Sequence, residues 1–247
     1  MKTDQIAVQT EDLTRRFGKF TAVKSATVTV MEGEIFGFLG ANGAGKTTMI
    51  RMLCGLLKPS SGRATVSGFD VYRQSEQIKQ NIGYMSQKFS LYDDLTISEN
   101  IEFYGGIYNL PVETILRRKE NLLQELGLQS EAEKLTRELP LGYKQRLALG
   151  CALLHDPPIL FLDEPTSGVD PKARRSFWNL IYLTSQKGKT IFVTTHFMDE
   201  AEYCHRLSIM RDGEIIALGP PAKLKETHKK SSMQEVFISI VNGELPA

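Results

Sequence analysis

The sequence has few cysteines, almost no net charge and no long apolar run. Its three cysteines, widely spaced and odd in number, fit neither a disulfide framework nor a zinc site. The net charge of +1 gives no overall field that would attract nucleic acid or an acidic partner. Apolar runs such as residues 159–162 are far shorter than the roughly 20 residues that span a bilayer, and residues 1–5 lack the apolar core of a signal peptide. We therefore expect buried thiols, no nucleic-acid partner and a location in the cytoplasm.

A glycine-rich stretch at residues 40–48, GANGAGKTT, is the most specific motif in the chain. It fits the phosphate-loop pattern G-x-x-x-x-G-K-[ST], and it lies between an apolar strand at 34–39 and a helix that begins at about 48. A helix N-terminus offers unpaired N–H groups to phosphates, and the glycines allow the backbone to curl around them. Lys46 adds a positive charge for the β- and γ-phosphates, and the Thr47 hydroxyl can bind a Mg²⁺ ion on the same oxygens. These residues predict a nucleotide-binding site.

Strand patterns on both sides of this loop predict an antiparallel beginning to the fold. Residues 6–13 and 21–30 alternate well enough to form two paired strands, and residues 63–72 have the pattern of a hairpin. An apolar segment at 81–86 predicts a core strand that leads directly to Gln87. The N-terminal part is therefore expected to contain an antiparallel β subdomain.

The second half of the chain has the pattern of a parallel sheet. Residues 158–164 form an unbroken apolar run that ends in two acidic residues, as in a strand covered on both faces. A helix over 171–187 leads to another apolar strand at 190–195, which His196 follows. The order strand–helix–strand implies right-handed crossovers between parallel strands, and residues 207–218 predict a final hairpin. We therefore expect an α/β fold with a mixed, mainly parallel sheet.

Helical periodicity replaces strand alternation from about residue 96. A capping box opens a helix over 96–108, a proline opens a second helix over 111–127, and a third is expected over 143–154. These helices predict an α-helical subdomain inserted between two halves of the core. We expect one domain over residues 1–247, in which 1–89 and 156–220 form the core with the β subdomain, about 90–155 the helical subdomain, and 221–247 a C-terminal tail.

Several short motifs follow one another in a defined order. They are the loop 40–48, Gln87 after a strand, residues 139–146, residues 160–164, residues 167–170 and His196. In this order they resemble the ATP-binding cassette (ABC) ATPase family over nearly the whole chain. The resemblance implies a nucleotide-binding domain with a P-loop NTPase core, ATP and Mg²⁺ as its cofactors, and ATP hydrolysis as its activity.

The resemblance also assigns a role to each polar residue of these motifs. Asp163, at the carboxyl end of a core strand, would hold Mg²⁺ through water, and Glu164 would be the general base for the attacking water. His196 would contact the γ-phosphate and help to position Glu164; the alternative is a core histidine with structural bonds only. Gln87 would contact Mg²⁺ and the water, in a loop that senses a membrane partner.

Phe17, in the turn expected at 15–19, is the candidate for the adenine ring. An aromatic side chain can stack on adenine, and the alternative is a hydrophobic lid residue. The predicted ATP-binding residues are therefore Phe17, Gly40, Ala41, Asn42, Gly43, Ala44, Gly45, Lys46, Thr47, Thr48 and Gln87, with Thr47, Gln87 and Asp163 at the metal and Lys46, Glu164 and His196 in catalysis.

One motif departs from the family. The usual Leu-Ser-Gly-Gly-Gln signature, which in this family caps ATP bound to the opposite subunit, is replaced by Leu139, Pro140, Leu141, Gly142 and Tyr143. Proline supplies neither a hydroxyl nor an N–H, and losing one charge-assisted hydrogen bond would weaken the contact with the opposite ATP by about 1.5–3 kcal/mol. The alternative is that Pro140 only rigidifies a loop that still works through Leu139, Gly142 and Tyr143. Both interpretations stay open at this point.

The same resemblance implies partners. Each ATP site of the family is built across two nucleotide-binding domains, and Asp170 would lie at that interface. The catalytic residues Lys46, Asp163, Glu164 and His196 are all present, whereas the signature segment is altered. This combination suits one member of an unequal pair, including one half of a tandem polypeptide, and it does not exclude a homodimer. The segments 195–206, 213–219 and 233–237 look like those of export-type drug-resistance subunits, which act with separate transmembrane permease subunits at the cytoplasmic face of the inner membrane. The alternatives are an ABC ATPase that acts on ribosomes or nucleic acid, and a regulatory cassette with an impaired signature.

Overall fold

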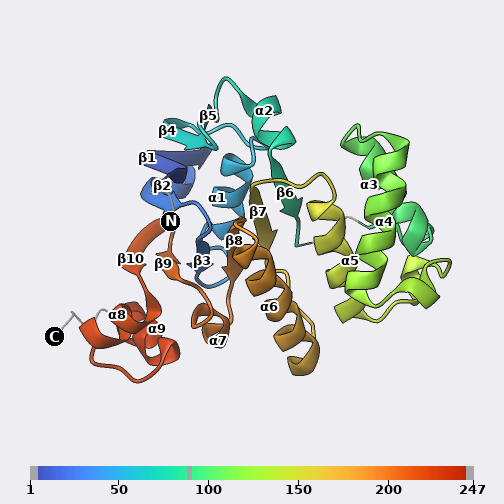
Figure 1. Cartoon of the computed structure of the whole chain (residues 1–247). Coiled ribbons are helices and arrows are strands. Elements are labelled where there is room, and N and C mark those ends of the chain that lie inside the picture. Colours follow the sequence, from blue (N-terminus) through green and yellow to red (C-terminus); the bar gives the residue numbers. More distant parts are fainter. Residues whose placement is uncertain (1–4, 88–90, 243–247) are drawn as a thin grey trace.

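Two sheets form the framework of the computed structural model, which describes residues 5–87 and 91–242 (Figure 1). The larger sheet has six strands in the order β10-β9-β3-β8-β7-β6, and only β10 is antiparallel to its neighbour. The smaller sheet has four antiparallel strands in the order β2-β1-β4-β5. The strands are β1 (Ile6–Phe17), β2 (Phe20–Met31), β3 (Ile35–Leu39), β4 (Ser61–Val66), β5 (Phe69–Asp70), β6 (Ile82–Met85), β7 (Ile159–Asp163), β8 (Thr190–Thr195), β9 (Arg206–Arg211) and β10 (Glu214–Gly219).

Helices cover the larger sheet and form a group at one side of the molecule, where α3, α4 and α5 lie together (Figure 1). The helices are α1 (Lys46–Leu53), α2 (Ser75–Gln80), α3 (Ile97–Ile107), α4 (Val112–Leu126), α5 (Leu141–Leu153), α6 (Pro171–Gln186), α7 (Met198–Ala201), α8 (Pro221–Thr227) and α9 (Met233–Val241), with short 3-10 turns at Gln129–Glu131 and Thr136–Glu138. The expected α/β fold, with a mainly parallel mixed sheet, an antiparallel sheet and inserted helices, is confirmed. The subdomain boundaries at about 90–155 and at 221–247 stay a prediction.

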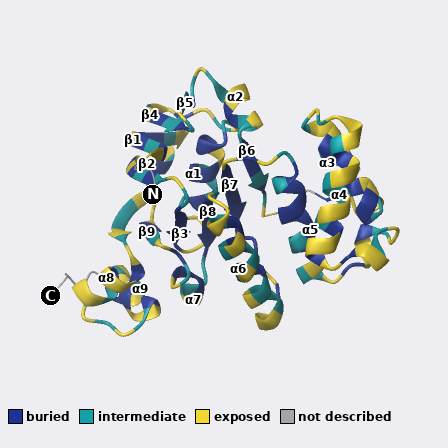
Figure 2. Ribbon diagram, viewed as in Figure 1, coloured by how far each residue is buried: buried dark blue, intermediate teal, exposed yellow. Residues whose placement is uncertain are grey.

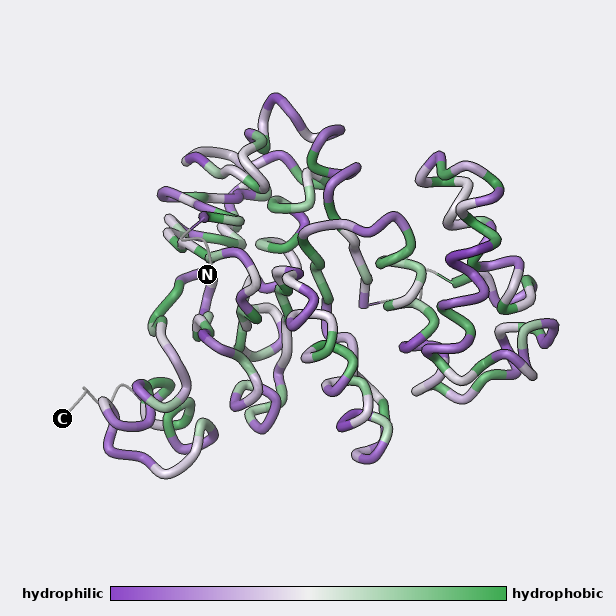
Figure 3. Tube along the Cα trace, viewed as in Figure 1, coloured by the Kyte–Doolittle hydropathy of each residue, from purple (hydrophilic) through white to green (hydrophobic). Residues whose placement is uncertain are grey.

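Alternate side chains of the central strand β3 enter two different cores. Ile35 and Leu39 pack with residues of α5 and α6, whereas Phe36 and Phe38 face α1 and the smaller sheet. Phe36, Phe38 and Phe192 contact one another with ring centroids 5.3 to 6.1 Å apart. The central strands are therefore buried on both faces, as Figure 2 shows, and they appear as hydrophobic segments in Figure 3.

The first two strands are longer than the sequence pattern indicated. We expected strands over 6–13 and 21–30, but β1 continues to Phe17 and only Gly18 and Lys19 form the turn. Register shifts between β1 and β2 interrupt the regular pairing, and Asp12 and Ser25 have φ values of 48° and 45°. Such bulges break the alternation that identifies a strand, so the pattern ended before the strand did.

The third inserted helix also begins earlier than expected. α5 starts at Leu141 rather than at residue 143, because Pro140 takes the N-cap position with φ −56° and ψ 149°. The capping box of α3 is present as predicted: the Thr96 hydroxyl and the Glu99 carboxylate each accept a backbone N–H bond. Helices α2, α7 and α8 were not predicted, because they have seven residues or fewer and no helical repeat is visible over such a length.

The three cysteines are buried, as the sequence led us to expect, and burial raises the pKa of each thiol. Within residues 5–87 and 91–242, no helix has the length and apolar character that crossing a membrane requires.

His155 ties the end of α5 to the sheet. Its Nε2 lies 2.9 Å from the carbonyl oxygen of Ile82, and its ring stacks on Tyr108 at 3.6 Å between centroids. Burial lowers the pKa of this imidazole from 6.5 to about 4. Between these pH values the unfolded chain binds a proton that the folded chain does not. We therefore expect stability to fall as the pH drops through this window, by about 2 kcal/mol once the partial exposure of the ring is discounted.

Urea unfolding of the native chain and of His155→Gln at several pH values measures this effect. A glutamine amide can still donate to the Ile82 carbonyl but does not titrate. The free energy of unfolding of the His155→Gln chain should therefore depend less on pH between about 6.5 and 4. An identical pH dependence in the two chains would show that His155 is not responsible.

Candidate functional site

The glycine-rich segment 40–48 forms the turn after β3 and the start of α1, and neighbouring backbone leaves no room for side chains at two of its positions. A Cβ on Gly40 would lie 2.5 Å from the carbonyl oxygen of Met210. Gly45 has φ 105°, and a Cβ there would lie 2.5 Å from the carbonyl oxygen of Ala22. Both positions require glycine, and Gly45 is followed directly by the first turn of α1. The loop therefore holds the backbone N–H groups of a helix N-terminus in a fixed place.

Lys46 points back into this loop. Its side chain is 4% exposed, and its ammonium donates to the carbonyl oxygens of Gly40 at 2.8 Å and Ala41 at 3.2 Å. The same ammonium lies 3.4 Å from Oε1 of Glu164. A buried cation held by neutral carbonyls and one carboxylate retains a strong attraction for further anions.

Asp163 ends β7 beside the same loop and contacts two hydroxyls. Its Oδ1 accepts hydrogen bonds from Thr47 at 3.0 Å and from Thr194 at 2.6 Å. Its Oδ2 is buried and has no hydrogen-bond partner within the described part of the chain, and burial raises the pKa of the carboxyl group. An orphaned carboxylate oxygen beside a threonine hydroxyl is the type of oxygen ligand pair that Mg²⁺ prefers, so these residues fit the ion.

Glu164 follows β7 with φ 49°, in the left-handed region. Its N–H donates to the hydroxyl of Thr194 at 2.8 Å and to the Thr194 carbonyl at 3.2 Å, and these bonds hold the unfavourable backbone conformation. Its Oε2 accepts a hydrogen bond from Gln87 at 3.0 Å and lies 3.2 Å from Nδ1 of His196. The Glu164 carboxylate, 7% exposed, is thus the centre of the site.

The structure therefore brings five predicted residues together at the carboxyl ends of β3, β7 and β8. They are Lys46, Thr47, Asp163, Glu164 and His196, with Gln87 reaching Glu164 from the end of β6. Ligands of open α/β sheets bind at this edge. Residues 88–90, the continuation of the loop that contains Gln87, lie outside the described part of the chain.

Thr194 is a site residue that the sequence analysis missed. Its hydroxyl donates to Asp163 and accepts from the backbone of Glu164, so it orients both carboxylates. The only available signal was its position two residues before His196, at the end of an apolar strand. Thr194 has this role because β7 pairs in parallel with β8 and Asp163 lies opposite Thr194.

Other predicted residues lie apart from this cluster. Phe17 ends β1, is 46% exposed, and has the guanidinium of Arg15 4.5 Å from its ring centroid. Asp170 caps α6, because its carboxylate accepts backbone N–H bonds from Lys172 and Ala173 at 3.0 Å. The helix that begins at Pro171 was predicted, whereas the role of Asp170 as its N-cap was not.

The signature-like segment lies at the start of α5, against α6. A Cβ on Gly142 would be 2.8 Å from Cβ of Ala173, Leu139 is buried, and Tyr143 is exposed with Arg146 5.2 Å from its ring. Among the described residues, no hydrogen bond or ion pair joins residues 139–143 to the loop 40–48.

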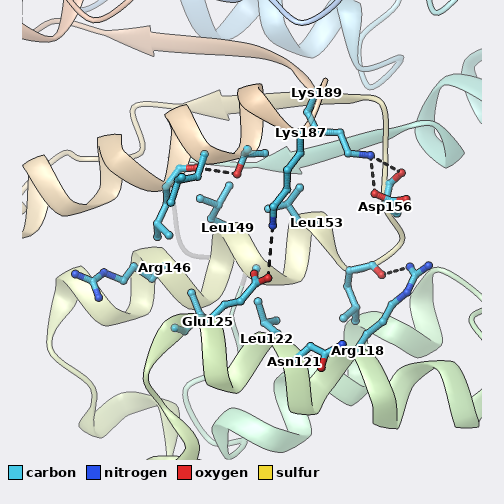
Figure 4. A pocket seen from close by; sticks show the side chains of 16 residues that line it. Arg118, Asn121, Leu122, Glu125, Arg146, Leu149, Leu153, Asp156, Lys187 and Lys189 are labelled. Carbon is cyan, nitrogen blue, oxygen red and sulfur yellow. Dashed lines mark hydrogen bonds and ion pairs between the residues drawn. The ribbon is translucent and has the colours of Figure 1, made fainter.

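A separate hollow of about 530 Å³ lies between α4, α5 and α6 (Figure 4). Leu122, Leu149 and Leu153 line it. The ammonium of Lys187 lies 3.5 Å from the carboxylate of Glu125 across it. None of its lining residues belongs to the predicted nucleotide site.

Comparison with known proteins identifies the family. The family model described as "ABC transporter" matches residues 23–167. This range includes the glycine-rich loop, Gln87, Asp163 and Glu164. The chain belongs to the ABC transporter family. This ABC domain is 47% identical over 243 residues to the "Probable multidrug ABC transporter ATP-binding protein YbhF" of Escherichia coli (strain K12), covering 96% of the chain but only 42% of that relative.

Three further comparisons support the same placement of this ABC domain. It is 35% identical to the "Linearmycin resistance ATP-binding protein LnrL" of Bacillus subtilis (strain 168), over 95% of the chain and 76% of the relative. A solved "ATP binding subunit of ABC transporter" superimposes with a TM-score of 0.85 at 27% identity, covering 95% and 99% of the two chains. The cassette MJ0796, in a dimeric post-hydrolysis structure bound to ADP and Pi, gives a TM-score of 0.77 at 27% identity, over 86% and 98%. The resemblance read from the motifs is confirmed.

Proposed function

We propose that this chain is the ATP-binding and ATP-hydrolysing subunit of an ABC exporter that drives transport through separate transmembrane permease subunits. The observation that carries the proposal is the convergence of Lys46, Thr47, Asp163, Glu164 and His196 at one edge of the sheet. A phosphate-binding loop alone would support nucleotide binding, but a buried carboxylate between a lysine and a histidine supports hydrolysis.

In this proposal the loop 40–48 binds the phosphates of ATP. Its backbone N–H groups and the Lys46 ammonium would attract the β- and γ-phosphates, and the side chain of Phe17, half-exposed at the end of β1, would stack on the adenine ring. Thr47 and Asp163, with Gln87, would hold Mg²⁺, Asp163 through water. When bound, that ion would neutralise charge on the phosphate oxygens.

Glu164 is proposed as the general base. A water molecule beside its carboxylate would lose a proton to it while attacking the γ-phosphate. His196 and Gln87 each contact the same carboxylate oxygen and would keep that water and Glu164 in line with the phosphate. ATP turnover therefore depends on the distances among these three side chains.

A second nucleotide-binding domain, identical or not, would complete the site. The segment 139–143 of one domain would cap ATP on the other, and Asp170 would lie near the interface. The dimeric, nucleotide-bound cassette MJ0796 supports such an arrangement. Closure around ATP and opening after hydrolysis would then move the permease.

Replacement of Pro140 by serine tests whether the signature segment is impaired. Serine restores a hydroxyl at the N-cap of α5, and one charge-assisted hydrogen bond of about 1.5–3 kcal/mol should lower the ATP concentration needed for half-maximal hydrolysis roughly 10–100-fold. The melting temperature should change little, because a serine cap gains about 1 kcal/mol while the loss of proline costs about 0.4–1 kcal/mol.

Pro111→Ser is the matched control for this variant, because Pro111 caps α4 with nearly the same backbone angles, φ −58° and ψ 142°. The control should leave the ATP dependence unchanged. If Pro140→Ser behaves like the control, Pro140 only rigidifies a working loop.

Co-purification from membranes tests the transport assignment. The chain should be recovered at the cytoplasmic face of the inner membrane, bound peripherally to a permease, and released without detergent when that permease is absent. A second, unlike cassette in the same preparation would establish an unequal pair. Recovery with ribosomes or nucleic acid, and without a permease, would contradict the proposal.

A further inference from the structure

A buried carboxylate outside the proposed catalytic set lies between the two segments that carry Glu164 and His196. Glu200 belongs to the short helix α7, and its side chain is 0% exposed. Its Oε1 accepts a hydrogen bond from the Thr166 hydroxyl, and its Oε2 accepts one from the Thr195 hydroxyl at 2.6 Å. A carboxylate that is fully removed from water requires such donors, so these contacts fix its position.

The two threonines are close neighbours of the catalytic residues in the chain. Thr166 lies two residues after Glu164, and Thr195 directly precedes His196. Both threonines are buried, and the Thr195 hydroxyl also accepts a hydrogen bond from the backbone N–H of Phe197 at 3.0 Å. One carboxylate therefore joins the loop after β7 to the end of β8.

Arg174 connects this carboxylate to the residue that follows His196. Its Nε lies 3.5 Å from Oε1 of Glu200, and its guanidinium lies 3.9 Å from the ring centroid of Phe197. The Phe197 ring is in turn 4.2 Å from the His196 ring. The arginine supplies the opposite charge that a buried carboxylate needs, and it stacks on the side chain that follows the histidine.

We propose that Glu200 is a positioning residue that sets the separation of Glu164 and His196. It acts through Thr166 and Thr195 and does not itself contact ATP. The Glu164 carboxylate lies 3.2 Å from Nδ1 of His196, and this distance depends on how the loop after β7 sits against the end of β8. The inference rests on the proposed hydrolysis by Glu164 and His196.

The test compares Glu200→Ala, Glu200→Gln and Thr195→Val in the complete complex purified from membranes. Glu200→Ala removes the acceptor of both threonines, and a misplacement of about 1 Å should reduce kcat about 100-fold. The KM for ATP should change less than about twofold, because the contacts of Lys46 and Thr47 are untouched. Thr195→Val removes one of the two bonds at nearly the same volume and should lower kcat in the same direction.

Glu200→Gln should lose much less activity than Glu200→Ala. Its amide can accept from one threonine hydroxyl and donate to the other, because a hydroxyl serves as donor or acceptor. Only the charge that faces Arg174 is lost, so kcat should remain within about tenfold of the native value. Asp199→Asn is the control: the Asp199 side chain is 67% exposed, so water screens its ion pair with Arg174 and kcat should stay unchanged.

A double variant separates positioning from general stability. If Glu200 acts through His196, adding Glu200→Ala to His196→Ala should reduce kcat by less than about tenfold more, because coupled residues are not additive. Three outcomes would overturn the inference. The double variant could lose a further full 100-fold in kcat, or Glu200→Ala and Thr195→Val could both keep the native kcat. Alternatively, the loss in Glu200→Ala could come with weakened ATP binding and a lower melting temperature. Full turnover in Glu164→Gln would instead overturn the proposed function, which distinguishes the two failures.

Discussion

Glu164→Gln is expected to lose at least about 100-fold in the rate of ATP hydrolysis while retaining ATP. A general base contributes roughly 10²–10⁴-fold to such a reaction, and glutamine has nearly the shape of glutamate without its basic oxygen. The carboxylate is 7% exposed and lies 3.4 Å from the Lys46 ammonium. Removing its negative charge leaves that ammonium more available to phosphates, so ATP affinity should be equal or higher. Phosphate release and equilibrium ATP binding on the same sample provide the two measurements.

The exposed ion pair between Lys24 and Glu214 supplies the control for this variant. These side chains are 43% and 57% exposed and 3.1 Å apart, a geometry that contributes little to stability. Glu214→Gln makes the same chemical change at an exposed carboxylate that bonds to Lys24, and it should hydrolyse ATP at the native rate. Undiminished hydrolysis by Glu164→Gln would remove Glu164 from the catalytic role.

Lys46→Ala is expected to lose ATP itself. The ammonium is 4% exposed and donates to two loop carbonyls, so its removal takes away a buried cation that would face the phosphates in the proposed site. Charge-assisted hydrogen bonds of about 1.5–3 kcal/mol correspond to a roughly 10–100-fold fall in ATP affinity. Titration calorimetry with ATP measures this fall directly.

Lys24→Ala is the matched control, because it removes a lysine from an exposed ion pair. It should bind ATP like the native chain. The two site variants should then differ in kind, since Lys46→Ala loses binding whereas Glu164→Gln keeps binding and loses turnover. Native ATP affinity in Lys46→Ala would contradict the assignment of loop 40–48 to the phosphates.

The sequence predicted most of the site because its features are local. A phosphate loop needs glycines at fixed positions between a strand and a helix, and the structure shows why, since Met210 and Ala22 exclude side chains at Gly40 and Gly45. The apolar run that ends in Asp163 likewise identifies a buried strand and its carboxyl end. Such features are read directly from neighbouring residues.

Residues that act across the sheet were not predictable in this way. Thr194 and Glu200 meet their partners only when β7 pairs with β8 and α7 packs against the end of β8, and a single threonine or glutamate has no distinctive pattern. The lengths of β1 and β2 were wrong because register shifts broke their alternation. The roles of the site residues, and of Phe17, Asp170 and the segment 139–143, stay predictions.

The central claim is tested most directly by the mass of the ATP-bound Glu164→Gln chain. It is measured for the chain alone and for the chain mixed with the chains that co-purify from membranes. If two nucleotide-binding domains share the site, saturating ATP should join a second such domain to the first, and removal of ATP should separate them. Multi-angle light scattering after size exclusion measures this change. A single cassette per particle at saturating ATP, both for the chain alone and with the co-purifying chains, would contradict the account.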